Sequence, residues 1–206
     1  MWIDCQQNTD DWLDMRAGKV TGSAIGKIMA NYGKPFGEPA KKLAVDIAVE
    51  RITGKRITTN DYKNSHMERG HEEEPIARML YEEMFFVDVS NGGFYDNGKT
   101  GCSPDGLVLD DGVIEIKSVI ATTHYATIER GSLDPSYKWQ CYFNLRESGR
   151  KWIDFVSYCS SYPKKTNIYV DRIEKYDIVE EIKMIEKRLE EFEKLVEKVS
   201  SRITKN

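Results

Sequence analysis

Residues 103–117 read SPDGLVLDDGVIEIK, and this stretch has the form of a β-hairpin. Two short and mostly apolar runs, 107–109 and 113–117, lie on either side of the Asp-Asp-Gly at 110–112, which is typical of a tight turn between strands. The sequence therefore predicts two antiparallel strands joined by this turn. Because the turn folds the second strand back along the first, residues at the open end of the hairpin are brought together.

The open end of this hairpin carries three ionisable side chains. Residues two apart on a strand share a face, so Glu115 and Lys117 should point together while Ile116 points into the core. We expect Asp105 to converge on them from the first strand. Two carboxylates suit Mg²⁺ or Mn²⁺, which would activate water and neutralise phosphate charge, while Lys117 orients the water or stabilises the transition state. The alternative is a surface ion pair, because Glu-x-Lys alone is commonplace.

Upstream of the hairpin the pattern is helical. Residues 21–29 begin with Thr and Ser side chains suited to capping a short helix. Residues 39–53 have apolar positions at helical spacing and stop at Gly54. Residues 72–86 indicate a third helix, with Pro75 near its first turn. We therefore expect three helices before a β-like stretch at residues 94–119.

Downstream of the hairpin, helix and strand alternate. A helix is expected from the cap Asp134 and the following Pro135 to a stop near Gly149. Strands are expected at residues 152–159 and 166–170.

An amphipathic helix at about residues 174–200 closes the chain. Its apolar residues alternate steps of four and three, which is a heptad seam formed by Ile178, Ile182, Ile185, Leu189, Phe192, Val196 and Val199. A seam this short more often packs on its own domain than on another chain. Association with another chain through this helix is the alternative.

The order of these elements indicates an α/β or α+β fold with a mixed central β-sheet flanked by helices. The chain has 206 residues, 40% of them hydrophobic, and we predict a single domain over residues 1–206. No apolar run is long enough to span a membrane and residues 1–12 lack the pattern of a secretory signal, so a soluble cytoplasmic protein is expected. Four scattered cysteines lack the spacing of a zinc site and are expected to be reduced thiols: Cys5, Cys102, Cys141 and Cys159.

The formal charge of −4 does not favour binding to a polyanion. Residues 174–199 carry nine acidic and six basic side chains, so the rest of the chain is closer to neutral. Residues 41–69 hold seven basic side chains against four acidic ones, and they could form a local phosphate-binding patch. A solvated charged surface is an equally good interpretation of that stretch.

Taken together, the hairpin residues resemble the PD-(D/E)xK nuclease superfamily, which has a restriction-endonuclease-like core and uses the equivalents of Asp105, Glu115 and Lys117 as its catalytic triad. Over roughly residues 10–145 the order and spacing of further motifs resemble the lambda-exonuclease or YqaJ-type viral recombinase family. These motifs are Asp11-Trp12, Arg16-Ala-Gly18, Thr21-Gly-Ser23, Arg69-Gly-His-Glu-Glu-Glu74, Gly101-Cys-Ser-Pro-Asp-Gly106, Glu115-Ile-Lys117 and Tyr137-Lys-Trp-Gln140.

The resemblance implies further roles around the hairpin. It makes Glu74 a third active-site carboxylate, although Glu73 is an alternative one residue away and Glu74 could instead be a charge favoured at a helix N-terminus. It makes Gln140 a residue that positions the attacking water, where the alternative is a half-buried polar side chain with a backbone partner. It also implies that the Ile116 backbone carbonyl binds metal beside the two hairpin carboxylates, and that two Mg²⁺ ions serve each site. Tyr142 stands where many relatives carry a second glutamine.

The resemblance also implies a pocket for a terminal 5′-phosphate, formed by Arg16, Ser23 and Ser103. A guanidinium and hydroxyls are chemically suited to that dianion. The alternative is that Arg16 pairs with Asp11 or Asp14 and that Ser23 only caps a helix.

The activity implied is metal-dependent 5′→3′ digestion of one strand at double-stranded DNA ends, which leaves 3′ single-stranded tails for homologous recombination by strand annealing. A ring-shaped homotrimer, a single-strand annealing partner and the cytoplasm of a bacterium hosting a phage or prophage are implied with it. Two alternatives stay open: a restriction-like endonuclease of the same superfamily, and a DNA-binding or recombinase-loading module without catalysis. Relatives with an iron–sulfur cluster need grouped cysteines, which this sequence lacks.

Overall fold

A mixed five-stranded sheet lies at the centre of the fold, and the computed structural model describes it within residues 1–57 and 65–205. Its strand order is β3-β6-β7-β8-β9. The strand β7 pairs antiparallel with β6 and parallel with β8, so the expected mixed sheet flanked by helices is confirmed. The bounds are β3 Val89–Ser90, β6 Gly106–Val108, β7 Gly112–Ser118, β8 Trp152–Tyr158 and β9 Ile168–Glu174.

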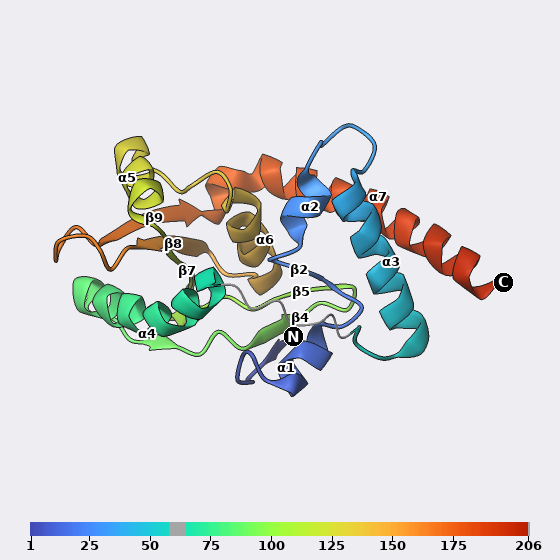
Figure 1. Cartoon of the computed structure of the whole chain (residues 1–206), viewed down its shortest axis with the longest axis horizontal. Helices are drawn as coiled ribbons and strands as arrows, with labels where there is room; N and C mark the ends of the chain where they lie inside the picture. Colours follow the sequence, from blue (N-terminus) through green and yellow to red (C-terminus); the bar gives the residue numbers. More distant parts are fainter. Residues whose placement is uncertain (58–64, 206) are drawn as a thin grey trace.

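Helices cover this sheet on two sides, as Figure 1 shows. Alternate residues of β7 face them: Ile114 and Ile116 pack with Ala77 and Tyr81 of α4, whereas Val113 belongs to the larger core under the other helices. The helices are α1 Asp10–Arg16, α2 Ile25–Met29, α3 Glu38–Thr53, α4 Ser65–Phe85, α5 Ala121–Arg130, α6 Lys138–Ser148 and α7 Val179–Thr204. A 3₁₀ turn, Lys175–Ile178, leads into α7.

A second, smaller sheet has the order β1-β4-β5-β2. The β-like stretch expected at residues 94–119 is therefore divided between two sheets. The strand β2 pairs in parallel with β5, which places Thr21 opposite Gly101 and brings the segment after β2 next to the loop before Asp105. The bounds are β1 Trp2–Ile3, β2 Val20–Thr21, β4 Phe94–Asp96 and β5 Thr100–Cys102.

The predicted hairpin is present, with its turn one residue earlier than expected. Gly112 already belongs to β7 and pairs with Val108, so Leu109 occupies the turn with a positive φ of 48°. At the open end, the Asp105 backbone N–H donates to the Ile114 carbonyl at 3.0 Å. The hydrogen bonds that join β6 to β7 therefore begin at Asp105.

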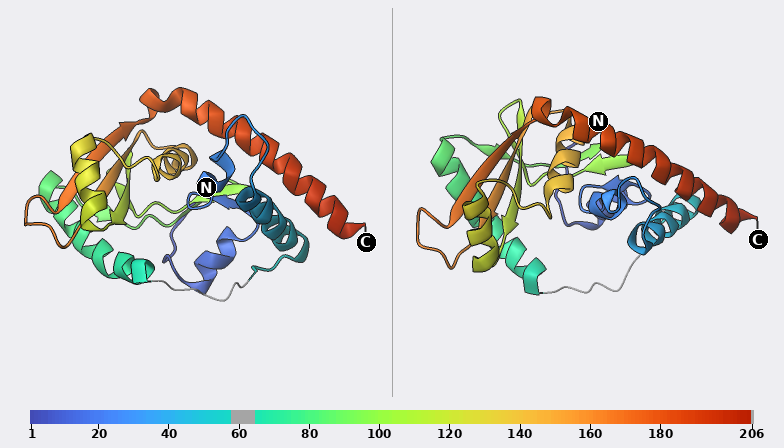
Figure 2. Two further views of the ribbon diagram at one scale, coloured as in Figure 1. Left: turned by 45° about the horizontal axis from the view of Figure 1, so that its top comes forward. Right: turned by 90° about the horizontal axis from the view of Figure 1, so that it is seen from above.

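The closing helix packs against its own chain. Figure 2 shows α7 lying across α2 and α3. From the seam, Ile185, Phe192 and Val196 are fully buried. Arg188 is also buried, and it donates to the carbonyls of Ile28 and Lys34 at 2.9 and 3.0 Å. The seam predicted from the sequence therefore serves the fold of this chain.

Three helix starts differ from the sequence expectation. The helix α2 follows Ala24 with no side-chain cap, because the Ala24 N–H bonds the Thr21 carbonyl instead. The helix α4 begins at Ser65, so Pro75 lies inside it. The helix α6 begins at Lys138, because the Asp134 carboxylate accepts from the Ser136 N–H and closes a separate turn.

Other boundaries hold or shift by small amounts. The stops predicted at Gly54 and near Gly149 are confirmed, because α3 ends at Thr53 and α6 at Ser148. The glycine that follows each helix is in the left-handed conformation. The last strand begins two residues later and extends to Glu174. The helix α5, Ala121–Arg130, is absent from the sequence prediction. No helix in the described part of the chain has both the length and the hydropathy needed to cross a bilayer.

Most of the basic side chains at residues 41–69 are engaged within the protein. Lys41 pairs with Glu38 at 2.6 Å, Arg51 with Glu193 at 2.7 Å and Arg56 with Asp10 at 3.0 Å. Lys63 lies outside the described residues. Of the described residues in this stretch, Arg69 lines the cavity considered next.

Candidate active site

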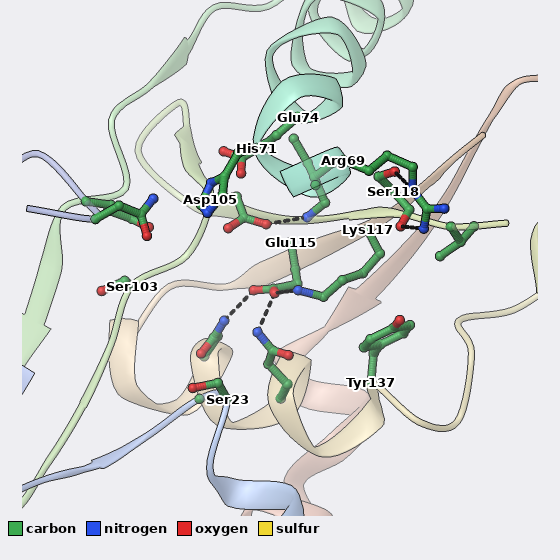
Figure 3. Close-up of a pocket in the computed structure, with 18 of the residues that line it drawn as sticks. Ser23, Arg69, His71, Glu74, Ser103, Asp105, Glu115, Lys117, Ser118 and Tyr137 are labelled. Carbon is green, nitrogen blue, oxygen red and sulfur yellow. Dashed lines mark hydrogen bonds and ion pairs between the residues drawn. The ribbon is translucent and has the colours of Figure 1, made fainter. Parts of the chain in front are cut away.

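A cavity of about 710 Å³ opens where α4, the hairpin, α6 and the segment between α1 and α2 meet. Figure 3 shows Glu74 on one side of the Glu115 carboxylate and Ser23 on the opposite side. The residues that the family resemblance places at the catalytic centre and in the phosphate pocket all line this cavity: Arg16, Ser23, Glu74, Ser103, Asp105, Glu115, Ile116, Lys117 and Gln140.

Glu115 lies at the centre of a hydrogen-bond network. Its side chain is only 1% exposed, because β7 directs it toward α6. Its Oε1 accepts from Lys117 Nζ and from Gln140 Nε2, and its Oε2 accepts from Asn144 Nδ2 at 2.7 Å. A buried carboxylate held by three donors keeps one orientation. The expected common face of Glu115 and Lys117 is present, and Gln140 bonds a side chain rather than the backbone.

Asp105 is fixed by the same strand. Its Oδ2 accepts from the Ile116 N–H at 2.6 Å, and its backbone carbonyl accepts from Arg78. The Ile116 side chain packs in the core on the α4 face, as predicted, while the residue also lines the cavity. The hairpin thus brings both carboxylates to one end of the cavity.

The two neighbouring glutamates of α4 have different surroundings. Glu74 lines the cavity and contacts Arg78 at 3.4 Å. Glu73 points elsewhere, accepting from Ser118 Oγ at 2.5 Å and from Ser160 Oγ at 2.6 Å. The structure therefore brings Glu74, not Glu73, to the hairpin carboxylates. Because α4 begins nine residues before Glu74, the helix-terminus interpretation of its charge is wrong.

Burial raises the pKa values of all three carboxyl groups. For Glu74 and for Glu115, burial and then the Asp105 charge raise the pKa to about 7 in each case. The pKa of Asp105 is raised by burial, against the opposing effects of Lys117, the Ile116 N–H and Arg78. Burial acts to lower the pKa of Lys117, but Glu115 and Asp105 outweigh it and the net change is upward. The cluster therefore sets three carboxyl groups, one of them buried, against the Lys117 ammonium and the Arg78 guanidinium.

This donor set fits a hard divalent cation, since carboxylate oxygens that repel one another are the ligands Mg²⁺ and Mn²⁺ prefer. Within residues 1–57 and 65–205, however, no three His, Cys, Asp or Glu side chains are already gathered into a metal-binding group. The Glu115 oxygens are instead bonded to Lys117, Gln140 and Asn144. Metal binding by Asp105 and Glu115 therefore remains a prediction.

The predicted phosphate-binding residues also lie together. Arg16 Nη2 donates to Ser23 Oγ at 3.3 Å and to Thr21 Oγ1 at 3.4 Å, and its guanidinium stacks 4.0 Å from the centre of the Trp12 ring. Trp12 Nε1 donates to Ser103 Oγ at 2.8 Å. Trp12, only 9% exposed, thus connects the arginine to the loop before Asp105.

The Arg16 guanidinium has no carboxylate partner in the described part of the chain. The alternative pairing with Asp11 or Asp14 is not formed, and Asp14 instead lies 3.5 Å from Arg56. Burial lowers the pKa of Arg16 to about 10, against the opposing effects of Cys102 and Glu115. Among the described residues, this half-buried guanidinium bonds only hydroxyl groups, so it is suited to an anion entering the cavity.

A model of the YqaJ-like viral recombinase domain matches residues 11–151, which is over half of the chain and contains every one of these residues. The chain belongs to the YqaJ-like viral recombinase family. No curated protein matches it significantly.

Solved structures agree with this family assignment. The chain is similar to LHK-Exo, solved in complex with dAMP, with 33% identity and a TM-score of 0.78 over 96% of this chain and 99% of that one. It is likewise similar to an alkaline exonuclease (LHK-Exo) from Laribacter hongkongensis, with 32% identity and a TM-score of 0.77 over the same shares. A phage-related exonuclease from Haemophilus somnus 129PT, 18% identical over 90% of this chain and 96% of that one with a TM-score of 0.66, shares the fold.

Membership of the YqaJ-like family and these exonuclease neighbours support a nuclease that acts on DNA in phage-type recombination. The fold is restriction-endonuclease-like, as predicted. The YqaJ-like chain also has two residues at this site that the sequence did not predict. Asn144 lines the cavity, and Arg78 contacts Glu74 and donates to the Asp105 carbonyl. Asn144 follows Gln140 by four residues on α6, so helical spacing from a motif residue was the signal that could have found it.

Proposed function

We propose that the protein is a metal-dependent 5′→3′ exonuclease that degrades one strand from double-stranded DNA ends and leaves 3′ single-stranded tails. The observation that carries this proposal is one cavity with two chemical parts. One part is the cluster of Asp105, Glu115 and Lys117. The other is the Arg16 guanidinium, which has no carboxylate partner among the described residues, together with the Ser23 hydroxyl. An enzyme that cuts within a duplex has no need of the second part.

In this proposal the Arg16 guanidinium binds the terminal 5′-phosphate, and Ser23 and Ser103 contribute hydroxyl donors. The stacking of Trp12 on Arg16 and its bond to Ser103 keep the guanidinium in place before DNA arrives. Binding energy from the terminal phosphate then fixes the next phosphodiester bond relative to the carboxylates. Binding of the terminal phosphate therefore also places the bond to be cut at the carboxylates.

Asp105, Glu115 and the Ile116 carbonyl are the groups that we propose hold Mg²⁺, with Mn²⁺ as a substitute and two ions per site. Metal bound there supplies activation of water and neutralisation of phosphate charge. The Lys117 ammonium group points toward the phosphate and stabilises the negative charge that develops on it in the transition state. Glu74 orients the attacking water and accepts its proton, a role that suits a carboxyl group with a pKa of about 7. Gln140 holds Glu115 and positions the same water.

The test is a linear duplex labelled separately at each 5′ end and incubated with and without Mg²⁺. We expect Mg²⁺-dependent release of mononucleotides from 5′ ends, faster from phosphorylated than from hydroxyl ends. Release from 3′ ends, or equal activity in a chelator, would contradict the proposal. Nicking of a covalently closed circle would indicate the endonuclease instead, and end binding without any cutting would indicate the non-catalytic module.

We also propose that the protein works as a ring-shaped trimer around DNA and delivers its single strand to an annealing partner in the host cytoplasm. The support is the family resemblance together with the charge of −4, because topological linkage to the substrate can replace phosphate affinity.

A further inference from the structure

Asn144 is a buried polar side chain of the cavity that the proposed chemistry leaves without a role. It is 1% exposed and lies one helical turn after Gln140 on α6. Gln140 and Lys117 both donate to Oε1 of Glu115. Among the residues that the structure describes, Asn144 is the only donor to the other oxygen, Oε2, at 2.7 Å. The orientation of the central carboxylate therefore depends on this amide.

The bond to Glu115 also fixes the opposite end of the Asn144 amide. A carboxylate accepts hydrogen bonds, so the amide must turn its NH₂ toward Glu115 and its Oδ1 away. That Oδ1 is buried and has no donor within residues 1–57 and 65–205. Rotating the amide by 180° would not give Oδ1 a hydrogen-bond donor, because Oδ1 would then face the Glu115 carboxylate oxygen.

The buried Oδ1 lies against the backbone of Gly22. A Cβ built on Gly22 would lie 2.3 Å from Asn144 Oδ1 and 3.2 Å from its Cγ, so a methyl group there would force the Asn144 amide or the loop to move. Gly22 stands between Thr21 and Ser23, the two hydroxyls to which Arg16 donates. Asn144 therefore touches the Glu115 carboxylate at one end and the Arg16-binding loop at the other.

We propose that Asn144 is a positioning residue that couples the loop at residues 21–23 to the orientation of Glu115. This inference rests on the proposed function, because it assigns that loop to the terminal phosphate. A phosphate that draws the loop into place fixes Gly22, and Gly22 fixes the amide that holds Oε2. An end without a phosphate leaves the loop and the carboxylate less well aligned, so kcat falls as well as affinity.

The test is a double-mutant cycle of wild type, Gly22→Ala, Asn144→Ala and the double variant. In each protein kcat and KM are measured on 5′-phosphorylated and 5′-hydroxyl ends, and the melting temperature is recorded. We expect Gly22→Ala alone to lower both kcat on phosphorylated ends, by about tenfold, and the preference for those ends. In the double variant the methyl group added at position 22 no longer collides with an amide at position 144. The kcat of the double variant should therefore be no lower than that of Asn144→Ala. Gly26→Ala in α2, where a Cβ meets nothing within 4 Å, is the matched control and should behave as wild type.

Asn144→Asp keeps the volume of the side chain and puts a carboxylate against Glu115. It should lower kcat by about tenfold or more while the Gly22 contact remains. If the two alanine effects multiply in kcat and add in melting temperature, the coupling is refuted. A second result would also overturn the proposal. If the effects of the two alanine substitutions on melting temperature are non-additive, but every variant keeps the wild-type preference for phosphorylated ends, the contact exists without serving end recognition.

Failure of the proposed function has a different signature. Wild-type protein that releases nothing from 5′ ends in Mg²⁺ contradicts the exonuclease assignment and with it the role of the loop. Should Gly22→Ala fail to fold, recovery of folding by adding Asn144→Ala would support the contact, and failure of both to fold would refute it.

Discussion

Lys117 is the residue on which the proposed chemistry depends most directly. Its ammonium is held by Glu115 and lies 5.5 Å from the centre of the Tyr137 ring, so it has little freedom to move. Lys117→Ala should bind duplex ends but cut them about a hundredfold more slowly or worse, because a fixed charge beside the phosphate is lost. Gel-shift and single-turnover cutting assays separate the two effects.

Lys138→Ala is the matched control for Lys117, since Lys138 pairs with Glu181 at 3.4 Å and does not line the cavity. Wild-type cutting by Lys117→Ala would refute the role assigned to this lysine.

Arg16 gives a second prediction at the residue scale. Arg16→Ala should reduce the ratio of cutting rates on phosphorylated and hydroxyl ends by about tenfold or more, because a charge-assisted contact to the phosphate is removed. Arg56→Ala is the control, since this guanidinium pairs with Asp10 of α1, outside the cavity. A ratio unchanged by Arg16→Ala would remove the 5′-phosphate pocket from the proposal.

The raised pKa values of Glu74 and Glu115 predict how pH and metal act together. A carboxyl group whose pKa rises on folding stabilises the fold at acidic pH, and that contribution is lost as pH rises through about 7. Bound Mg²⁺ can offset the repulsion between the carboxylates only when the carboxyl groups are ionised. The difference in melting temperature between Mg²⁺ and EDTA should therefore grow from about pH 6 to about pH 8 and vanish in Asp105→Asn. A pH-independent difference would place metal binding elsewhere.

At the scale of elements, the hairpin depends on a close contact between β7 and β8. A Cβ on Gly112 would lie 2.1 Å from the Trp152 ring, which stacks 3.7 Å from the Arg172 guanidinium. Gly112→Ala should push this ring aside and lower the free energy of unfolding by about 1–3 kcal/mol. Denaturant unfolding measures the loss, and Gly26→Ala is again the control. A loss below about 0.5 kcal/mol would show that the ring moves freely.

Some of the helices and strands could be predicted from the sequence and others could not. The hairpin was predictable because alternation and turn residues are local signals, and they also placed Asp105, Glu115 and Lys117. The start of α4 was not, since Pro75 resembles a residue of a first turn, whereas the helix already begins at Ser65. Helical spacing from Gln140 could have indicated Asn144, but not its role, because its neighbours Glu115 and Gly22 come from β7 and from the loop after β2, which no local pattern joins.

At the scale of the whole molecule, charge and topology bear on how DNA is retained. The chain carries −4, and several of its basic side chains pair with acids, so its charge as a whole does not favour binding to phosphates. A protein held by phosphate contacts alone would lose DNA steeply as salt rises. A closed ring would not, because release then requires the ring to open or reach an end.

Light scattering should therefore give three times the chain mass, and the length of strand removed per binding event should change little between low and physiological salt. Because the α7 seam is buried within the chain, charge reversal on the exposed face of that helix, such as Lys187→Glu, should leave the mass unchanged. A monomer under working conditions would remove the ring. Retention would then have to come from Arg16 and the other cations at the cavity, and the strand removed per binding event should shorten sharply with salt.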